Sequence, residues 1–339
     1  NRSAIDKRNE EAQPGIGHLR LDPLVNEWVV IASHRQHRVF LPPKELCPLC
    51  ASVGEKLTEI PDKDYEVVVF GNRAPSLTTP KGNFKLAQMS GLTTPDVDAA
   101  GACEVVCYTS DHSSSFAKLS EKQIRAVLEA WKDRDNALSK LPFIEQVFIF
   151  ENRGEEVGVT LSHPHGQIYA YSFLPPKIEK MLQVANDHLV KTGKVLLDEV
   201  IKREIKDEKR IISQNGEWIA YVPYAARYPF EIHIAPLRGV SNMSSLDENQ
   251  SATFAPIAKE VLSRLDGVFG IEMAYIAAWH QAPVRVGRDV MRLHWQITSV
   301  RRAPGKLKYL AGSESAMGAF IMDMRPEQSA AQLREVVLK

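Results

Sequence analysis

Hydrophobic and polar positions alternate along several short stretches of the chain, and each of these stretches predicts a β-strand. Residues 28–32 are rich in tryptophan and β-branched side chains, and residues 145–150 alternate at Val147 and Ile149. Side chains that alternate in this way face opposite sides of a sheet. The dipeptide Asn215-Gly216 separates residues 210–214 from residues 217–222 and predicts a hairpin, because both residues readily adopt the positive φ of a two-residue turn.

Apolar residues spaced three or four positions apart predict helices elsewhere in the chain. Residues 121–140 form the clearest case, in which Ser120 can cap the start and the apolar side chains are Ile124, Val127, Leu128 and Trp131. Residues 177–206 also read as largely helical. They are expected to connect two halves of the protein.

The same order of elements occurs twice. A helix that opens at Glu121 is followed by a strand and then by His165, and a helix that opens at Glu248 is followed by a strand and then by His294. The two helix-to-histidine separations differ by only two residues, which favours an internal duplication, although chance alternation of helices and strands is the alternative. The pattern predicts an α+β protein with halves at residues 18–176 and 177–339, after a disordered lead-in at residues 1–17.

Composition excludes some classes of partner. The 339 residues include 42 Lys and Arg and 42 Asp and Glu, so no net charge attracts the chain to nucleic acid or to an anionic membrane. No run of about 20 apolar residues is present to span a bilayer. The polar start of the chain lacks the apolar segment of a signal peptide, and a cytoplasmic location is therefore expected.

Residues 163–167 read His-Pro-His-Gly-Gln and continue into a β-rich segment. If the strand register holds from the start of this motif, His163, His165 and Gln167 share one face. The ordinary explanation is a pair of solvated or hydrogen-bonded histidines. The chemical alternative is that an imidazole acts as a nucleophile or as a metal ligand.

Cys47 and Cys50 form a CxxC motif, which spaces two thiolates to bind one tetrahedral cation. His112 and His163 are the available candidates for the other two ligands. A redox pair or two unrelated buried cysteines are the alternatives, but the motif follows a proline-rich segment rather than opening a helix after a strand. Cys103 and Cys107 have an odd spacing for metal binding and are expected to be core residues.

Several blocks of the sequence together resemble a known family. The CPLC block at residues 47–50 is followed by Asp111-His112, by FENRG at 150–154, by HPHGQIYA at 163–170 and by KYLAGSE at 308–314. In this order they resemble the galactose-1-phosphate uridylyltransferases, a branch of the histidine-triad superfamily. The resemblance runs from about residue 18 to the C-terminus. It implies a duplicated histidine-triad-like fold in which antiparallel sheets are packed with helices.

The resemblance implies a ping-pong exchange of UMP between UDP-glucose and galactose 1-phosphate. His165 would be the nucleophile that forms a uridylyl-histidine intermediate, and Gln167 would donate a hydrogen bond to the phosphoryl group. One structural Zn²⁺ per chain would be bound by Cys47, Cys50, His112 and His163.

Further positions match substrate contacts of the family. The residues near the nucleotide would be Arg35, Arg38, Asn72, Asn152 and Thr160, and those near the hexose would be Lys308, Tyr309 and Glu314. The expected partners are UDP-glucose, UDP-galactose and hexose 1-phosphates. The resemblance also implies a homodimer in which the segment around Lys308 reaches the neighbouring subunit.

Some features depart from the family or leave alternatives open. Arg73 and Ala74 follow Asn72 where the family often has an aspartate and an aromatic residue, and Arg292 stands where some relatives have a histidine ligand to a second metal, so that second site is not expected. An adenylyl-transferring phosphorylase of the same superfamily and a noncatalytic zinc-stabilised nucleotide-binding protein remain the rivals. Because His163 and His165 have different predicted partners, the chain at Pro164 must be irregular enough to separate them.

Overall fold

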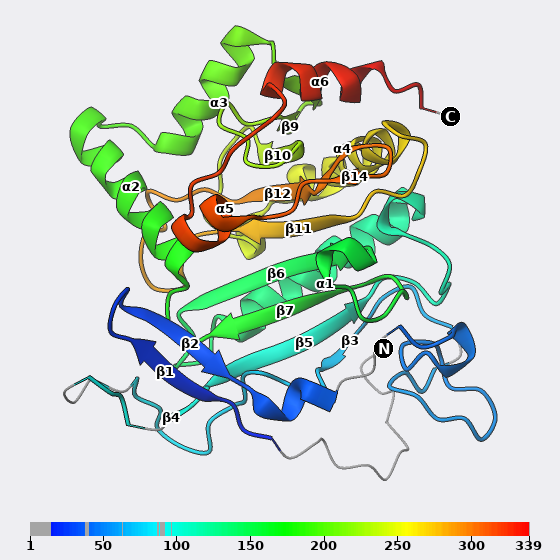
Figure 1. The fold of residues 1–339 in the computed structure, drawn as a ribbon, viewed down its shortest axis with the longest axis vertical. Coiled ribbons are helices and arrows are strands. Elements are labelled where there is room, and N and C mark those ends of the chain that lie inside the picture. Colours follow the sequence, from blue (N-terminus) through cyan, green and yellow to red (C-terminus); the bar gives the residue numbers. More distant parts are fainter. Residues whose placement is uncertain are drawn as a thin grey trace.

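The computed structural model of the protein describes residues 15–37, 41–62, 64–86, 88, 92–95 and 97–338. Within these ranges the largest sheet has nine strands in the order β3-β5-β7-β6-β11-β12-β10-β9-β8, and every neighbouring pair is antiparallel (Figure 1). The strands of this sheet are β3 (Val68–Gly71), β5 (Gly101–Cys107), β6 (Gln146–Arg153), β7 (His165–Tyr171), β8 (Ile211–Gln214), β9 (Trp218–Tyr221), β10 (Phe230–Pro236), β11 (Tyr275–His280) and β12 (His294–Ser299).

Smaller sheets and the helices surround this central sheet. The small sheets contain β1 (His18–Asp22), β2 (Glu27–Ile31) and β4 (Val97–Asp98), and β13 (Arg301–Ala303) with β14 (Lys306–Leu307). The α-helices are α1 (Glu121–Leu138), α2 (Pro176–Thr192), α3 (Leu196–Asp207), α4 (Glu248–Gly267), α5 (Gly312–Met317) and α6 (Pro326–Glu335). Short 3-10 helices are η1 (Ser33–His37), η2 (Lys44–Leu46), η3 (Phe116–Lys118), η4 (Glu155–Val157) and η5 (Met243–Ser245).

The two long helices α1 and α4 begin in the same way. Ser120 accepts a hydrogen bond from the backbone N–H of Gln123, whose side chain accepts one in return from the backbone of Ser120. Asp247 and Gln250 form the same reciprocal pair at the start of α4. Each pair satisfies two backbone donors that a helix would otherwise leave unpaired, and so defines where the helix begins.

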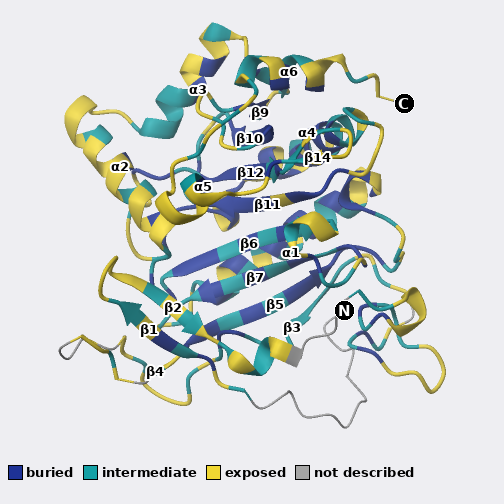
Figure 2. Ribbon diagram, viewed as in Figure 1, coloured by how far each residue is buried: buried dark blue, intermediate teal, exposed yellow. Residues whose placement is uncertain are grey.

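The main core lies between these helices and one face of the central sheet. Trp131 of α1 packs against Trp279 of β11 and Trp295 of β12, and the two strand tryptophans stack with ring centroids 5.6 Å apart. Phe254 of α4 contacts the same pair of rings. Figure 2 shows that the middle strands of the sheet are largely buried, whereas much of α2 is exposed. The core therefore continues across both halves of the chain.

The sheet repeats the same element order on either side of its centre. From β6 outward the strands are β7, β5 and β3, and from β11 outward they are β12, β10 and β9. Helix α1 immediately precedes β6, and α4 immediately precedes β11. This arrangement is the one that a duplication produces. The exact boundary between the halves stays a prediction.

The elements predicted from periodicity are present with small shifts at their ends. Residues 28–32 correspond to β2, residues 145–150 to the start of β6 and residues 121–140 to α1. A hairpin joins β8 and β9 as predicted, but neither Asn215 nor Gly216 has a positive φ. The turn is instead stabilised by the Asn215 side chain, whose oxygen accepts from the backbone N–H groups of Glu217 and Trp218. The predicted lead-in lies largely outside the described residues. No helix in the described part of the chain is long and apolar enough to cross a membrane.

Asp135 of α1 connects the first half to two loops of the second half. Its side chain is fully buried and accepts hydrogen bonds from the Gln281 amide at 2.7 Å, from the Asn242 amide at 3.0 Å and from the backbone N–H of Ser244 at 3.0 Å. A buried carboxylate is tolerated when several donors surround it in this way. Asn242 and Gln281 are buried with it, so their amide groups depend on this carboxylate as an acceptor.

We expect Asp135→Asn to lower the free energy of unfolding by about 2–3 kcal/mol, because an amide N–H₂ then faces donors that need an acceptor. Urea unfolding with an unchanged slope would measure the loss. Asp133→Asn, at an exposed position on the same helix, is the control and should change stability by less than about 0.5 kcal/mol. Equal midpoints for both variants would contradict the assigned role.

Candidate active site and metal centre

Cys47, Cys50, His112 and His163 meet in one cluster. One ligand atom from each residue lies within 4.8 Å of the others, so the cluster could hold a metal ion. The Cys50 Sγ is 3.3 Å from His112 Nδ1 and 3.7 Å from His163 Nδ1. Cys47 and His163 are buried, and the other two side chains are partly buried. The structure therefore brings together all four predicted ligands, which come from three separate segments of the first half.

The chemistry of the donors fits a cation. Burial, together with the neighbouring Cys47, raises the pKa of Cys50 to about 11, and burial lowers the pKa of His163 to about 4. Both shifts express the cost of placing charge away from water. A bound cation would reverse this for the cysteines, because it stabilises thiolates, and it would use the neutral imidazoles as they are.

Hydrogen bonds to Nε2, the ring nitrogen away from the cysteine sulfur, fix the orientation of the His163 ring. Its Nε2 lies 2.8 Å from the carbonyl oxygen of Thr109 and 3.0 Å from the hydroxyl of Tyr65. Since a carbonyl can only accept, Nε2 carries the hydrogen and the lone pair is on Nδ1, which faces the cysteine sulfur. This arrangement is typical of histidine metal ligands, whose second nitrogen is held by a hydrogen bond.

The backbone of the same residue orients the next histidine. The Nδ1 of His165 lies 2.7 Å from the carbonyl oxygen of His163 and donates its hydrogen to it. The imidazole of His165 therefore carries its lone pair on Nε2. One residue thus offers its ring to the metal cluster and its carbonyl group to His165.

The expectation that His163, His165 and Gln167 share one strand face is wrong for His163. Strand β7 begins at His165, and His163 precedes it. Pro164 has no N–H to donate to a neighbouring strand, and its backbone only accepts, from the N–H of Tyr108 at 3.3 Å. The irregularity predicted at Pro164 is confirmed, and it lets the two rings turn to different partners.

His165 and Gln167 do lie on the same face of β7, opposite the buried Gly166 and Ile168. The Gln167 Oε1 is buried without a hydrogen-bond partner in the described part of the protein. Glu151 of β6 pairs with Gly166, so the register places Asn152 beside His165. Asn152 and His165 also line one cavity. Three predicted site residues therefore lie on adjacent strands.

The other residues predicted near the nucleotide lie around this face. The guanidinium of Arg35 in η1 donates to the hydroxyl of Tyr169 at 3.2 Å, two residues beyond Gln167 on the same face. Asn72 follows β3, and its Oδ1 accepts from the backbone of Ala74 at 3.0 Å. Thr160 lies in the loop between β6 and β7. Arg38 lies outside the described residues.

The residues predicted near the hexose are not brought to His165 within one chain. Lys308 and Glu314 are buried and form an ion pair of 2.9 Å, and the Lys308 ammonium also donates to the carbonyl of Ile321. The hydrogen bond from Lys308 lowers the pKa of Glu314 to about 2. Tyr309 is 76% exposed. The ion pair between Lys308 and Glu314 links the segment before α5 to the helix itself and leaves the Tyr309 side chain exposed to solvent.

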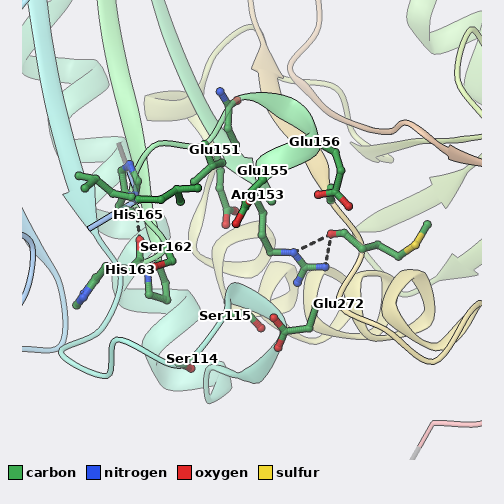
Figure 3. A pocket seen from close by; sticks show the side chains of 18 residues that line it. Ser114, Ser115, Glu151, Arg153, Glu155, Glu156, Ser162, His163, His165 and Glu272 are labelled. Carbon is green, nitrogen blue, oxygen red and sulfur yellow. Dashed lines mark hydrogen bonds between the residues drawn. The ribbon is translucent and has the colours of Figure 1, made fainter. Parts of the chain in front are cut away.

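A cavity of about 600 Å³ extends from His163 and His165 along the loop after β6 (Figure 3). Glu151 and Arg153 line it. Arg153 lies over the ring of Tyr275 at 4.4 Å, pairs with Asp266 and donates to the carbonyl of Met273 at 2.9 Å. Glu151 is 4% exposed, and its Oε2 has no hydrogen-bond partner among the described residues. Burial raises the pKa of Glu151 to about 7, although Arg153 opposes the shift.

Sequence reasoning missed Tyr65, Thr109 and Glu151 as parts of this region. Tyr65 and Thr109 hold His163 from distant segments and carry no local signal. Glu151 had one: it continues the buried alternation of Val147 and Ile149, which places a carboxyl group on the core side of a strand. Cys103 and Cys107 are buried on β5 as predicted, outside the metal cluster.

Comparisons with known proteins agree over nearly the whole chain. Residues 7–175 match the family model described as galactose-1-phosphate uridyl transferase, N-terminal domain, and residues 180–338 match its C-terminal domain. A galactose-1-phosphate uridylyltransferase of Streptomyces lividans is 40% identical over 99% of this chain and 91% of its own length. The Thermotoga maritima enzyme of the same name is 38% identical over 94% of this chain and 98% of its own length.

A solved structure described as a uridylyltransferase has the same fold. It superposes with a TM-score of 0.82 and 32% identity, and the match covers 94% of this chain and 98% of the other. The α+β architecture is therefore shared over 94% of this chain.

The buried Glu151 predicts a pH dependence. Between about pH 4.5 and 7 the unfolded chain ionises this carboxyl group while the folded chain keeps it protonated, so the folded state binds more protons and loses stability as the pH rises. Glu151→Gln removes this term. Its unfolding free energy should match that of the unmodified protein near pH 4.5 and exceed it by about 2–3 kcal/mol at pH 8.

Urea unfolding of both proteins from pH 4.5 to 8 measures this difference. The exposed Glu155→Gln provides the matched change of charge in the next loop. A difference between Glu151→Gln and the unmodified protein that stays constant over this range would show that Glu151 ionises normally.

Proposed function

The chain belongs to the galactose-1-phosphate uridyl transferase family, a family of nucleotidyltransferases, and on that premise we propose that it exchanges UMP between UDP-glucose and galactose 1-phosphate through His165. The observation that carries the proposal is the hydrogen bond from His165 Nδ1 to the carbonyl of His163, which leaves the lone pair on Nε2 at a cavity. A neutral imidazole held in this tautomer is a nucleophile ready to attack phosphorus.

In the first half-reaction, Nε2 of His165 forms a bond to the α-phosphorus of UDP-glucose. The bond from that phosphorus to the bridging oxygen breaks, and glucose 1-phosphate leaves with the electron pair. In the second half-reaction, a phosphate oxygen of galactose 1-phosphate attacks the same phosphorus, and the bond to Nε2 breaks to release UDP-galactose. The carbonyl of His163 accepts from Nδ1 throughout, so it stabilises the positive imidazolium of the intermediate.

Neutral and cationic donors on the adjoining strands suit the charge that develops on the phosphoryl oxygens. Gln167 on the same face and Asn152 on the neighbouring strand can donate amide hydrogens without ionising. Arg35, held by Tyr169, adds a positive charge on this side of the sheet. Asn72 and Thr160 are proposed nucleotide contacts, and Lys308, Tyr309 and Glu314 are proposed hexose contacts of the neighbouring subunit.

We infer that the metal of the Cys47, Cys50, His112 and His163 cluster is a structural zinc ion. Two thiolates and two imidazoles make a closed tetrahedral set, and in such a set sulfur and nitrogen ligands lie about 3.6 Å apart. The two sulfur–nitrogen distances of 3.3 and 3.7 Å are close to this value. When bound, the ion supplies no reacting group and anchors His163.

The nearest rival is an adenylyl-transferring phosphorylase, which would use His165 in the same way with another base. Relatives at 38–40% identity that are named galactose-1-phosphate uridylyltransferases favour the uridylyl reaction. A noncatalytic zinc-stabilised binding protein has no need for an imidazole held in one tautomer at a cavity. A homodimer with shared sites and a cytoplasmic location stay predictions.

We expect His165→Gly to retain its bound metal and its fold while uridylyl transfer falls at least about a thousandfold, because the group that forms the covalent intermediate is lost. Turnover with UDP-glucose and galactose 1-phosphate, metal content by mass spectrometry and the melting temperature measure these effects. Intact mass after separate incubation with UDP-glucose and with ADP-glucose should show an adduct only for UDP-glucose and only in the unmodified protein. Near-normal turnover of His165→Gly would show that His165 is not the nucleophile.

Cys50→Ser should reduce bound zinc from one ion per chain to a small fraction and lower turnover about 10–100-fold, because His163 then loses the anchor that positions its carbonyl group. Its melting temperature should fall as well. Cys103→Ser is the matched control, since Cys103 is buried outside the cluster and should keep its zinc. Full zinc content and normal turnover in Cys50→Ser would disprove the anchoring role.

A further inference from the structure

The second half of the sheet contains a counterpart of the His165 site. Strands β11 and β12 take the place of β6 and β7, so His294 and Gln296 correspond to His165 and Gln167. The hydrogen bond is repeated too: His294 Nδ1 lies 3.1 Å from the carbonyl oxygen of Arg292. Arg292 stands where the first half has the metal ligand His163. The second half therefore keeps the strand geometry with different chemistry.

A cavity of about 450 Å³ lies over this counterpart, and its lining includes Lys177 at the start of α2 and Phe320 in the segment that follows α5. Its polar lining includes Lys177, Arg227, His280 and Gln296, and its aromatic lining includes Tyr228 and Phe320. His294 does not line the cavity. It is 6% exposed and is covered by the rings of His233 and His280, whose centroids are each 5.3 Å away.

The cavity has more positively charged groups than negatively charged groups near it. The Lys177 ammonium donates to Gln296 Oε1 at 2.6 Å and lies 3.3 Å from His280 Nε2, both of which are neutral partners. Glu231 lies behind them, and its carboxylate accepts from the Gln296 amide and from the backbone N–H of Arg227, each at 2.6 Å. Glu231 Oε1 also lies 3.2 Å from His233 Nε2, and the Arg227 guanidinium lies over the ring of Phe320 at 5.5 Å. Desolvation of the ammonium lowers the pKa of Lys177 to about 8, although the Glu231 carboxylate opposes the shift.

A further feature suits an anion. Helix α2 begins at the cavity with Pro175 as its N-cap and no capping side chain, so the positive end of a 17-residue helix faces this region. His280 lines the cavity as a neutral group, because its Nε2 donates to Gln296 Oε1 at 2.8 Å and its Nδ1 therefore carries a lone pair. The two cations and the helix N-terminus are thus the groups of this cavity that attract an anion.

We propose that this second-half cavity binds a phosphate monoester of the hexose 1-phosphate class without reacting with it. Lys177 and Arg227 would bind the dianionic phosphate, and Tyr228 and Phe320 would contact the sugar ring. No bond to phosphorus forms, because the histidine that corresponds to His165 is buried beneath two other imidazoles. The site is separate from the proposed uridylyl transfer and would respond to the concentration of its substrates or products.

The test compares three proteins by calorimetric titration with glucose 1-phosphate, inorganic phosphate and UMP. Lys177→Met combined with Arg227→Gln removes the two cations of the cavity. Lys180→Met combined with Arg288→Gln is the control, since it removes two exposed positive charges outside the cavity lining. Zinc content and melting temperature establish that each variant is folded. His165→Gly is titrated alongside them.

The unmodified protein, the control and His165→Gly should each show a glucose 1-phosphate binding event that weakens at least about thirtyfold in the Lys177/Arg227 double variant. Binding of inorganic phosphate alone with the same loss would assign the site to free phosphate, and binding of UMP with that loss would assign it to a nucleotide. The proposal is overturned if the double variant binds all three ligands as the control does, or if the unmodified protein has no event sensitive to these residues. Transfer retained in His165→Gly would reject the proposed reaction and leave this binding result standing.

Discussion

The arrangement of the site depends on His163, which has one partner on its ring and another on its backbone. The ring Nδ1 faces Cys50 in the metal cluster, and the carbonyl oxygen accepts from His165 at 2.7 Å. A shift of the ring would move the carbonyl, because both belong to one residue next to a rigid proline. The cluster can therefore influence the tautomer and direction of His165 without touching phosphorus. This connection gives a physical reason for a cluster that could hold a metal to lie beside the proposed nucleophile.

The regular geometry of the sheet positions the other site residues without unusual residue types. His165 and Gln167 are aligned by the two-residue period of β7, and Asn152 joins them because β6 pairs with β7 in register. The opposite face of these strands packs against α1 and α4 with large aromatic side chains, so the strands that present the site cannot easily slide. Rigid strands hold reacting groups more closely than loops do, which suits an exchange that runs in both directions.

Sequence patterns predicted the elements that depend on neighbours in the chain. The start of α1 follows from Ser120 and Gln123, and the β8–β9 hairpin follows from Asn215-Gly216. The candidate metal ligands could be predicted because CxxC is a local motif and the family resemblance supplied the two histidines. Tyr65 and Glu151 were not accessible in that way, since their roles arise when distant segments pack. Likewise, the ion pair between Lys308 and Glu314 shows that two residues expected to face a ligand also hold their own segment together.

The two halves show what the strand geometry alone can and cannot provide. His165 and His294 both open a strand and both donate from Nδ1 to the carbonyl two residues earlier. His165 lines the cavity beside β6 and closely follows His163, a member of the cluster that could hold a metal, whereas His294 is covered by two imidazoles. The tautomer is therefore a property of the shared backbone, whereas reactivity depends on access to the ring. Burial of His294 lowers its pKa to about 3, so it stays neutral and has no route to a substrate. The same strand geometry therefore presents an accessible imidazole in one place and a covered one in the other.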